Sequence, residues 1–197
     1  RKLLGYSKRA IGPAGSMAIH RRWFGRARDK QYPIWRYDVD APDNWLVLGG
    51  RGCGKTRLGA EWVHALVTGA PPFSDRLDRY AQLALVGETL GDVREVMIDG
   101  PSGIRTIARD TPPRYEPTRR RLVWDSNGAQ AQVFSSEDPE SLRGPQFAAA
   151  WCDELAKWRN AEATFDMLQL GLRLGPRPHQ MVTTTPKPVP LVRRLMD

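Results

Sequence analysis

The chain has 197 residues, of which 41% are hydrophobic, and it carries a formal net charge of +8. This length fits one α/β domain with at most a small appendage. No apolar stretch approaches the roughly 18 residues that a membrane-spanning helix requires, and no secretory signal is visible, so no membrane partner is expected. Cys53 and Cys152 have no metal-ligand spacing and imply no disulfide framework, which favours a reducing cytoplasm.

The positive charge is concentrated near the N-terminus. Residues 1–30 hold nine basic residues and one acid, and the rest of the chain is neutral, with 21 residues of each sign. Such a basic segment favours contact with a polyanion, above all nucleic acid. A solvated tail or a linker from a larger protein would explain it equally well. We expect residues 1–30 to form a basic arm or small helical appendage, followed by one domain over residues 31–197.

The most specific motif is a glycine-rich loop after the first expected strand, which covers residues 45–48. Residues 49–56 read G-x-x-x-x-G-K-T, and a helical segment then runs to about Val67. A buried strand, a glycine turn and a helix N-terminus form a P-loop, whose backbone N–H groups converge on a polyphosphate. Lys55 would reach the β- and γ-phosphates of ATP, and Thr56 would ligate Mg²⁺. The expected phosphate-binding residues are Gly49, Gly50, Arg51, Gly52, Cys53, Gly54, Lys55 and Thr56.

The later part of the chain alternates between apolar runs and helical spacing. We expect, in chain order, a strand at 82–86, helical stretches at 90–98 and 104–109, a hairpin of 122–124 and 129–134, a strand at 147–152, a helix at 161–174, a strand at 180–185 and a helix at 191–196. Strands separated by helices indicate a mainly parallel central sheet flanked by helices, with an added β-hairpin.

Two acids follow the apolar run 147–152, about 100 residues after the P-loop. In a P-loop enzyme Asp153 would hold Mg²⁺, usually through water, and Glu154 would orient and polarise the attacking water. An extra strand, at 83–86, lies between the two motifs in sequence. The sequence therefore predicts an α/β P-loop NTPase of the ASCE type (additional strand, catalytic glutamate) that uses ATP and Mg²⁺.

Two arginines have open interpretations. Arg143, in a loop after an acidic segment, could enter a neighbouring active site and stabilise charge on the γ-phosphate. From spacing alone, a surface arginine paired with Glu137 or Asp138 is the better explanation. Arg51 could contact phosphate, pair with Glu154 or point to solvent.

Two further groups are candidates for function. The hydroxyl groups of Thr183, Thr184 and Thr185 could sense the γ-phosphate or its water, although threonine is also a good strand former. A second basic cluster could contact DNA phosphates, although alternating exposure on a strand would also explain it. This cluster consists of Arg105, Arg109, Arg114, Arg119, Arg120 and Arg121.

Together these blocks resemble the large terminase subunit of tailed bacteriophages and of related prophage or gene-transfer particles. The resemblance spans about residues 45–190, with the blocks in the expected order. Its more specific parts are the arginine-bearing P-loop and the Leu-Arg-Gly-Pro-Gln run at 142–146. The matching blocks are 45–62, 127–129, 134–147, 151–155 and 183–186.

The resemblance implies an ATPase motor that drives double-stranded viral DNA into a procapsid in the host bacterial cytoplasm. It also implies a homo-oligomeric ring on the capsid portal, monomeric in isolation, and a small terminase subunit as partner. By this resemblance Arg143 acts in trans on the neighbouring subunit, and Arg51 couples the nucleotide state to subunit contacts. Residues 183–185 would link hydrolysis to movement. Gln31 and Trp35, upstream of the P-loop, are candidates for adenine contacts.

The chain differs from the family pattern in two respects. Cys53 stands where similar proteins often carry Ser or Ala. Family members also carry a C-terminal metal nuclease domain, and this chain offers no such acidic cluster, so we expect no nuclease activity from it.

Two alternatives remain at this point. One is a helicase-like or DNA-remodelling P-loop ATPase, although helicases of that type need a second motor domain. The other is a nucleotide-regulated binding or scaffold protein with little turnover.

Overall fold

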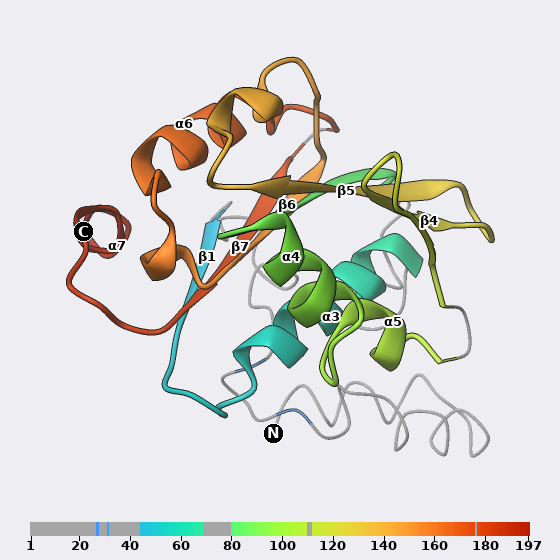
Figure 1. The fold of residues 1–197 in the computed structure, drawn as a ribbon, viewed down its shortest axis with the longest axis horizontal. Helices are drawn as coiled ribbons and strands as arrows, with labels where there is room; N and C mark the ends of the chain where they lie inside the picture. The colour runs from blue at the N-terminus through green and yellow to red at the C-terminus, as the bar shows by residue number, and fades with distance from the viewer. Residues whose placement is uncertain (1–26, 28–30, 32–43, 69–79, 110–111, 176) are drawn as a thin grey trace.

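The fold comes from a computed structural model, and the structure is described for residues 27, 31, 44–68, 80–109, 112–175 and 177–197 (Figure 1). Its strands are β1 (Asn44–Leu48), β2 (Gln82–Gly87), β3 (Arg114–Glu116), β4 (Arg121–Trp124), β5 (Ala129–Ser135), β6 (Ala149–Asp153) and β7 (His179–Thr184). Its α-helices are α3 (Lys55–Thr68), α4 (Leu90–Asp92), α5 (Ile104–Ile107), α6 (Ala161–Gly171) and α7 (Pro190–Arg194). A π-helix, η4 (Val93–Ile98), and two 3₁₀ helices, η5 (Pro139–Leu142) and η6 (Leu155–Lys157), complete the set.

These strands form one seven-stranded sheet in the order β1-β7-β6-β2-β5-β4-β3. The five strands from β1 to β5 in this order are parallel, and β4 and β3 continue the sheet antiparallel. The prediction of a mainly parallel sheet flanked by helices is therefore confirmed. The hairpin of β4 and β5 is also present, but β5 pairs with β2 from Gln130 to Ser135. The hairpin is thus an extension of the main sheet, because its second strand is a full member of the parallel set.

Several local expectations differ from the structure. The strand expected at 147–152 begins at Ala149, and the helices expected at 104–109 and 191–196 end at Ile107 and Arg194. Strand β3 was not predicted; three residues carry too short an alternation to be recognised. The helix expected over 161–174 ends at Gly171, because the next residue, Leu172, forms a bridge with Phe147. The helical stretch expected over 90–98 is present, but most of it is π-helical.

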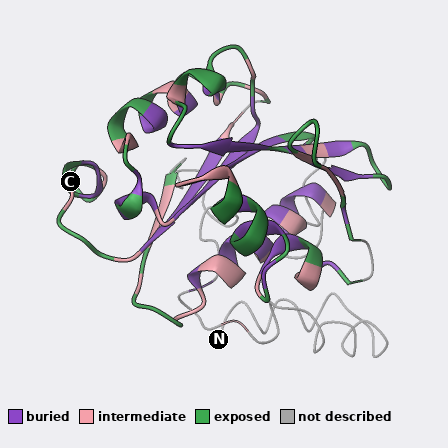
Figure 2. Ribbon diagram, viewed as in Figure 1, coloured by how far each residue is buried: buried purple, intermediate pink, exposed green. Residues whose placement is uncertain are grey.

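The sheet separates two hydrophobic cores. Alternate residues of a strand point to opposite faces, so Leu83 and Leu85 of β2 join one core and Ala84 and Val86 join the other. The first core packs against α3, η4 and α5, and the second against α6, η6 and α7. Figure 1 shows these two helical layers on opposite sides of the sheet, and Figure 2 shows the central strands β7, β6 and β2 between them as largely buried. Among the described residues, no helix is both long and apolar enough to cross a membrane.

The register of the parallel strands brings the predicted motifs to one edge of the sheet. Strand β7 lies between β1, which leads into the P-loop, and β6, which ends in Asp153. Leu48 aligns with Thr184, and Asp153 aligns with Thr183. The carboxyl ends of β1, β7 and β6 are therefore level with one another. In space, the strand that separates the two motifs is β7, whereas β2 separates them only in sequence.

Candidate functional site

The P-loop connects the end of β1 to the first turn of α3. Gly52 and Gly54 have φ angles of 71° and 87°, which place them in the left-handed region where a side chain is disfavoured. The backbone N–H of Gly49 donates to the carbonyl oxygen of Thr184 at 3.2 Å, so the start of the loop is fixed to β7. A helix of 14 residues begins at Lys55, and the N–H groups at the start of a helix favour bound anions.

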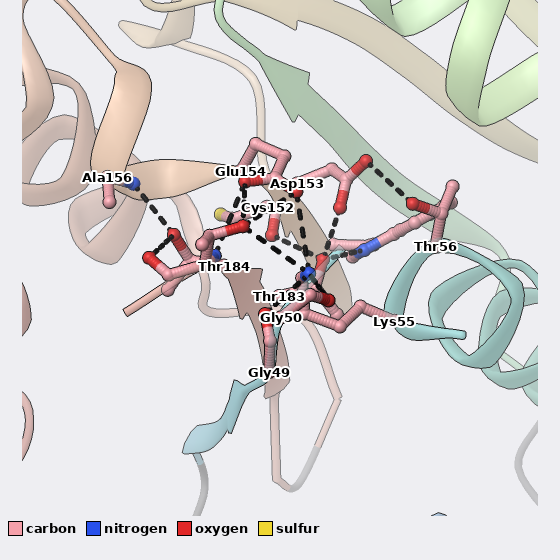
Figure 3. Close-up of polar contacts among 12 residues, drawn as sticks. Gly49, Gly50, Lys55, Thr56, Cys152, Asp153, Glu154, Ala156, Thr183 and Thr184 are labelled. Carbon is pink, nitrogen blue, oxygen red and sulfur yellow. Dashed lines mark hydrogen bonds and ion pairs between the residues drawn. The ribbon is translucent and has the colours of Figure 1, made fainter. Parts of the chain in front are cut away.

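Lys55 is buried at this helix start and points back toward the loop. Its ammonium group donates to the carbonyl oxygens of Gly49 at 2.7 Å and Gly50 at 3.0 Å. It also lies 3.5 Å from the Thr185 hydroxyl and 3.6 Å from a carboxylate oxygen of Glu154 (Figure 3). An ammonium group has three donors, and this one donates to two main-chain oxygens and the Thr185 hydroxyl while it forms an ion pair with Glu154. Lys55 therefore joins the P-loop to the acidic end of β6.

Asp153 lies between the P-loop helix and β7. The Thr183 hydroxyl donates to its Oδ1 at 2.6 Å, and the Thr56 hydroxyl faces its Oδ2 at 3.4 Å (Figure 3). Asp153 is 5% exposed, and burial raises the pKa of its carboxyl group to about 6, while the Thr183 hydrogen bond and the Lys55 charge oppose the rise. A cation bound at this point would favour the ionised form.

Glu154 has an unusual backbone conformation for a residue with a side chain. Its φ of 50° and ψ of 42° lie in the left-handed region, which costs energy and is found disproportionately at functional sites. Its carboxylate accepts hydrogen bonds from the Thr185 hydroxyl at 3.1 Å and from the Thr185 N–H at 3.3 Å. The strained turn thus directs the carboxylate toward the end of β7 and toward Lys55.

A cavity of about 60 Å³ opens beside the two acids. It is lined by Asp153 and Glu154 together with residues from η4 and from the end of β2. A water molecule needs roughly 10–15 Å³ of such volume, so the cavity has room for several. Glu154 therefore borders a space in which a nucleophilic water could be held.

The three threonines at the end of β7 have different partners. Thr183 contacts Asp153, and Thr185 contacts Glu154. The Thr184 hydroxyl accepts from the backbone N–H of Ala156 at 2.9 Å and so fixes η6 to β7. The predicted coupling residues therefore touch both acids and the segment that follows them.

The two arginines of uncertain role are both exposed. The Arg51 side chain makes no hydrogen bond or ion pair with any described residue, so the pairing with Glu154 considered above is not formed; Lys55 occupies that position. Arg143 lies just after η5, where its guanidinium contacts Glu140 at 3.1 Å. The expectation of pairing with Glu137 or Asp138 is therefore wrong, because the turn of η5 places the residue three positions earlier beside it.

Of the other residues predicted to contact adenine or DNA, only some are described by the structure. Gln31 is 8% exposed, whereas Trp35 and nearly all of the basic arm lie outside the described residues. Within the second basic cluster, Arg105 pairs with Asp99, and Arg114 and Arg121 share Glu116. In the described part of the chain no ion pair is formed by the other members, Arg109, Arg119 and Arg120, which are exposed.

The residues at this edge fit a magnesium nucleotide. The hydroxyl of Thr56 and the carboxylate of Asp153 are hard oxygen donors that face each other. No group of three His, Cys, Asp or Glu side chains within the described ranges could hold a metal by itself. Mg²⁺ commonly takes one or two protein oxygens and completes its shell with phosphate and water.

A family model provides the decisive comparison. The model described as "Terminase large subunit, T4likevirus-type, N-terminal" matches residues 46–197. The chain belongs to this large terminase family. The resemblance stated from the sequence is thereby confirmed, and the match begins inside β1 and includes the P-loop, the two acids and the three threonines. No curated protein matches this large terminase chain.

Solved structures support the fold of this large terminase chain. The large terminase of a thermophilic bacteriophage is similar with a TM-score of 0.61 and 16% identity, over 80% of this chain and 38% of that one. The same phage protein in complex with ADP gives a TM-score of 0.60 and 15% identity, over 76% and 36%. The N-terminal domain of the DNA packaging ATPase from bacteriophage phi29 gives 0.58 and 13%, over 85% and 87%. The chain therefore has the P-loop ATPase fold of these proteins and spans about two fifths of the thermophilic phage terminase.

Two residues at the site were not predicted from the sequence. The Trp151 indole N–H donates to the Thr183 hydroxyl at 2.8 Å, and the Trp158 indole N–H donates to the carbonyl oxygen of Asp153 at 3.0 Å. Both are buried. Their position on either side of the acidic pair was the only indication in the sequence, and buried tryptophans are usually interpreted as core residues.

Proposed function

We propose that this chain is the ATPase domain of a packaging motor, which hydrolyses ATP to move double-stranded viral DNA into a procapsid. The observation that carries the proposal is the convergence of Lys55, Asp153 and Glu154 at the carboxyl edge of one sheet. Lys55 lies within 3.6 Å of the Glu154 carboxylate. The large terminase family and the ATPase-domain folds of its structural neighbours support the same conclusion.

Each residue has a role that follows from its position. The backbone of residues 49–54 and the start of α3 bind the phosphates, and Lys55 exchanges its carbonyl partners for phosphate oxygens. Thr56 and Asp153 would hold Mg²⁺, and the ion would supply positive charge against the charge that develops on the phosphates. Glu154 orients a water for attack and accepts its proton.

The exposed arginines serve contacts with other subunits. The Arg143 side chain is 75% exposed and its salt bridge to Glu140 is also exposed, so it is readily exchanged for a nucleotide in a neighbouring copy. Arg51, at the open side of the P-loop, senses such a neighbour. Residues 183–185 transmit the nucleotide state, since they touch both acids and η6.

The wider assembly belongs to the same proposal. The working form is a homo-oligomeric ring on the capsid portal in the host bacterial cytoplasm, assisted by a small terminase subunit. The isolated chain is monomeric, its ATPase activity requires Mg²⁺, and we expect no nuclease activity from this chain. Residues 1–30 are a basic arm appended to the ATPase domain of residues 31–197.

The exposed Arg109, Arg119 and Arg120 are the strongest DNA contacts within the second cluster, and Gln31 and Trp35 contact adenine.

The proposal is tested by measuring phosphate release with and without double-stranded DNA, for the full chain and for a version lacking residues 1–30. We expect Mg²⁺-dependent turnover that duplex DNA stimulates, with less stimulation when the arm is removed. Strand displacement without movement along intact duplex would indicate a helicase-like ATPase instead. Absence of turnover even with DNA and assembled portals would indicate a nucleotide-regulated scaffold.

A further inference from the structure

A chain of buried hydrogen bonds connects the interior of the sheet to Asp153. The Trp151 indole N–H donates to the Thr183 hydroxyl at 2.8 Å, and that hydroxyl donates to Asp153 Oδ1 at 2.6 Å. Trp151 and Thr183 are fully buried. The register of β6 and β7 explains the geometry, because Thr183 is paired with Asp153 and lies two positions beyond the partner of Trp151.

The indole determines which way the hydroxyl hydrogen points. An indole N–H can only donate, so Thr183 must use a lone pair to accept from it. Its single hydrogen then goes to another oxygen, and Asp153 Oδ1 at 2.6 Å is closer than the carbonyl oxygen of Cys152 at 3.2 Å. With Oδ1 held in this way, Oδ2 is the oxygen that faces Thr56.

Gly59 supplies the space for this indole. A Cβ at position 59 would lie 2.0 Å from Cε2 and 2.3 Å from Nε1 of Trp151, closer than any real contact. Glycine in the middle of α3 is unfavourable for the helix relative to alanine. The helix nevertheless carries it where the indole lies close against its backbone.

We propose that Trp151 is a positioning residue for Asp153, that it acts through the Thr183 hydroxyl, and that Gly59 makes its placement possible. Their joint effect is to present Asp153 Oδ2 to the magnesium ion of the bound nucleotide. This inference rests on the proposed function, since it concerns the metal that accompanies ATP. Partners of a metal-ligand carboxylate commonly affect metal affinity, because they hold the ligand in one orientation.

The test is the binding of ATPγS, measured by titration calorimetry in excess Mg²⁺ and again in EDTA. The ratio of the two dissociation constants reports the contribution of the metal and needs no turnover. The main variant is Trp151→Phe, which keeps an apolar ring but removes the N–H. The matched control is Trp124→Phe, because Trp124 is equally buried in β4 and its indole N–H has no hydrogen-bond partner among the described residues. Circular dichroism confirms that each variant is folded.

We expect Trp151→Phe to reduce the Mg²⁺ enhancement roughly tenfold, at the lower end of the 10–100-fold range for lost partners of metal ligands. Binding in EDTA and the Trp124→Phe control should match the wild type. Thr183→Val should reduce the enhancement as well, and the double variant should be no worse than Thr183→Val alone, since both residues act along one hydrogen-bond chain. Gly59→Ala, which displaces the indole, should resemble Trp151→Phe.

Two results would overturn the inference while leaving the proposed function intact. One is a wild-type enhancement that Trp151→Phe leaves unchanged. The other is a loss in Trp151→Phe that adds in full to the loss in Thr183→Val, because Trp151 would then act by another route. A wild-type protein with no Mg²⁺ enhancement would instead contradict the proposed magnesium site itself.

Discussion

Lys55 and Glu154 face each other at the nucleotide site, with the Lys55 ammonium nitrogen 3.6 Å from Glu154 Oε1. The lysine side chain is 5% exposed and the glutamate side chain 25% exposed. The ammonium also donates to two P-loop carbonyl oxygens, and the carboxylate accepts from both the N–H and the hydroxyl of Thr185. Phosphates that take over Lys55 would therefore remove a partner of Glu154 as well. We therefore expect nucleotide binding and the placement of the Glu154 carboxylate to be linked through this contact.

Replacing Glu154 should separate binding from hydrolysis. In Glu154→Gln the side chain keeps its shape but is no longer a base, so we expect turnover to fall by roughly 10²–10⁴-fold, the usual contribution of general base catalysis. ATP affinity should stay within a few-fold of wild type, because the P-loop is unchanged. Phosphate release and titration calorimetry measure the two quantities. Glu137→Gln, at an exposed loop position, is the control. Equal loss of binding and turnover would show that Glu154 holds the nucleotide instead.

Removing Arg143 should change how activity depends on protein concentration. If the guanidinium acts on a neighbouring copy, specific activity rises steeply with concentration as copies associate, and Arg143→Ala flattens that rise. Folding should be unaffected, since the only ion pair of Arg143 in the described structure is the exposed one with Glu140, worth less than about 1 kcal/mol. Phosphate release over a wide concentration range provides the measurement, with Arg94→Ala, on the exposed face of η4, as control. A wild-type specific activity independent of concentration is incompatible with action in trans.

A thiol reagent should label Cys53 and lower ATPase activity mildly. The Cys53 sulfur lies against Gly49 in the P-loop, where a Cβ at position 49 would be only 2.5 Å from it. Cys152 is fully buried, and burial raises the pKa of its thiol to about 12, so it should stay unreactive at neutral pH. Mass spectrometry counts the labels, and phosphate release reports the activity. Cys53→Ser should abolish the sensitivity. Unchanged activity at one full label per chain would contradict this prediction.

The buried carboxyl group of Asp153 should make the metal-free protein less stable as pH rises. Burial raises its pKa from 3.8 to about 6, so between about pH 4 and 6 the folded state keeps a proton that the unfolded state has released. The free energy of unfolding therefore falls with pH across this window. The difference between the two pKa values corresponds to about 3 kcal/mol in the free energy of unfolding. This contribution to stability is fully lost above pH 6.

Urea unfolding in EDTA, from pH 4 to 7, tests this for the wild type and for Asp153→Asn. The stability advantage of the variant should grow by up to about 3 kcal/mol across the window, because asparagine never carries the buried charge. Asp125→Asn, at an exposed position, should show no such change. A difference between wild type and Asp153→Asn that does not vary with pH would contradict the assignment.

Much of the fold was accessible from local sequence patterns. The strands at 45–48, 82–86 and 180–185 were placed within one or two residues, because each is an apolar or β-branched run bounded by turn residues. The predicted end of an element was wrong where a contact with a residue distant in the sequence determines it. An example is Leu172, whose bridge to Phe147 ends the helix early. Strand β3 was missed because its three residues become a strand only through pairing with β4.

The candidate site also has some features that the local sequence predicts and others that only the fold determines. The P-loop and the acidic pair were evident, because glycine torsions and an apolar strand ending in acids are local properties. The partner of Arg143 was wrong, because the turn of η5 brings Glu140 beside it in place of the two acids that precede that turn. The roles of Trp151 and Gly59 were not predicted, since their contact exists only where β6 packs against α3.

By itself the sequence determined that this chain has a P-loop, a strand that ends in Asp153-Glu154, and alternating strands and helices that form a parallel sheet. These features depend on residues that are neighbours in the sequence, and so they can be predicted from the sequence alone. Only the tertiary structure decided that β7 lies between the two motifs, and that Thr183 and Thr185 thereby contact Asp153 and Glu154. The physical reason is that strand order is set by long crossover connections and by packing on both faces of the sheet, which no local pattern encodes.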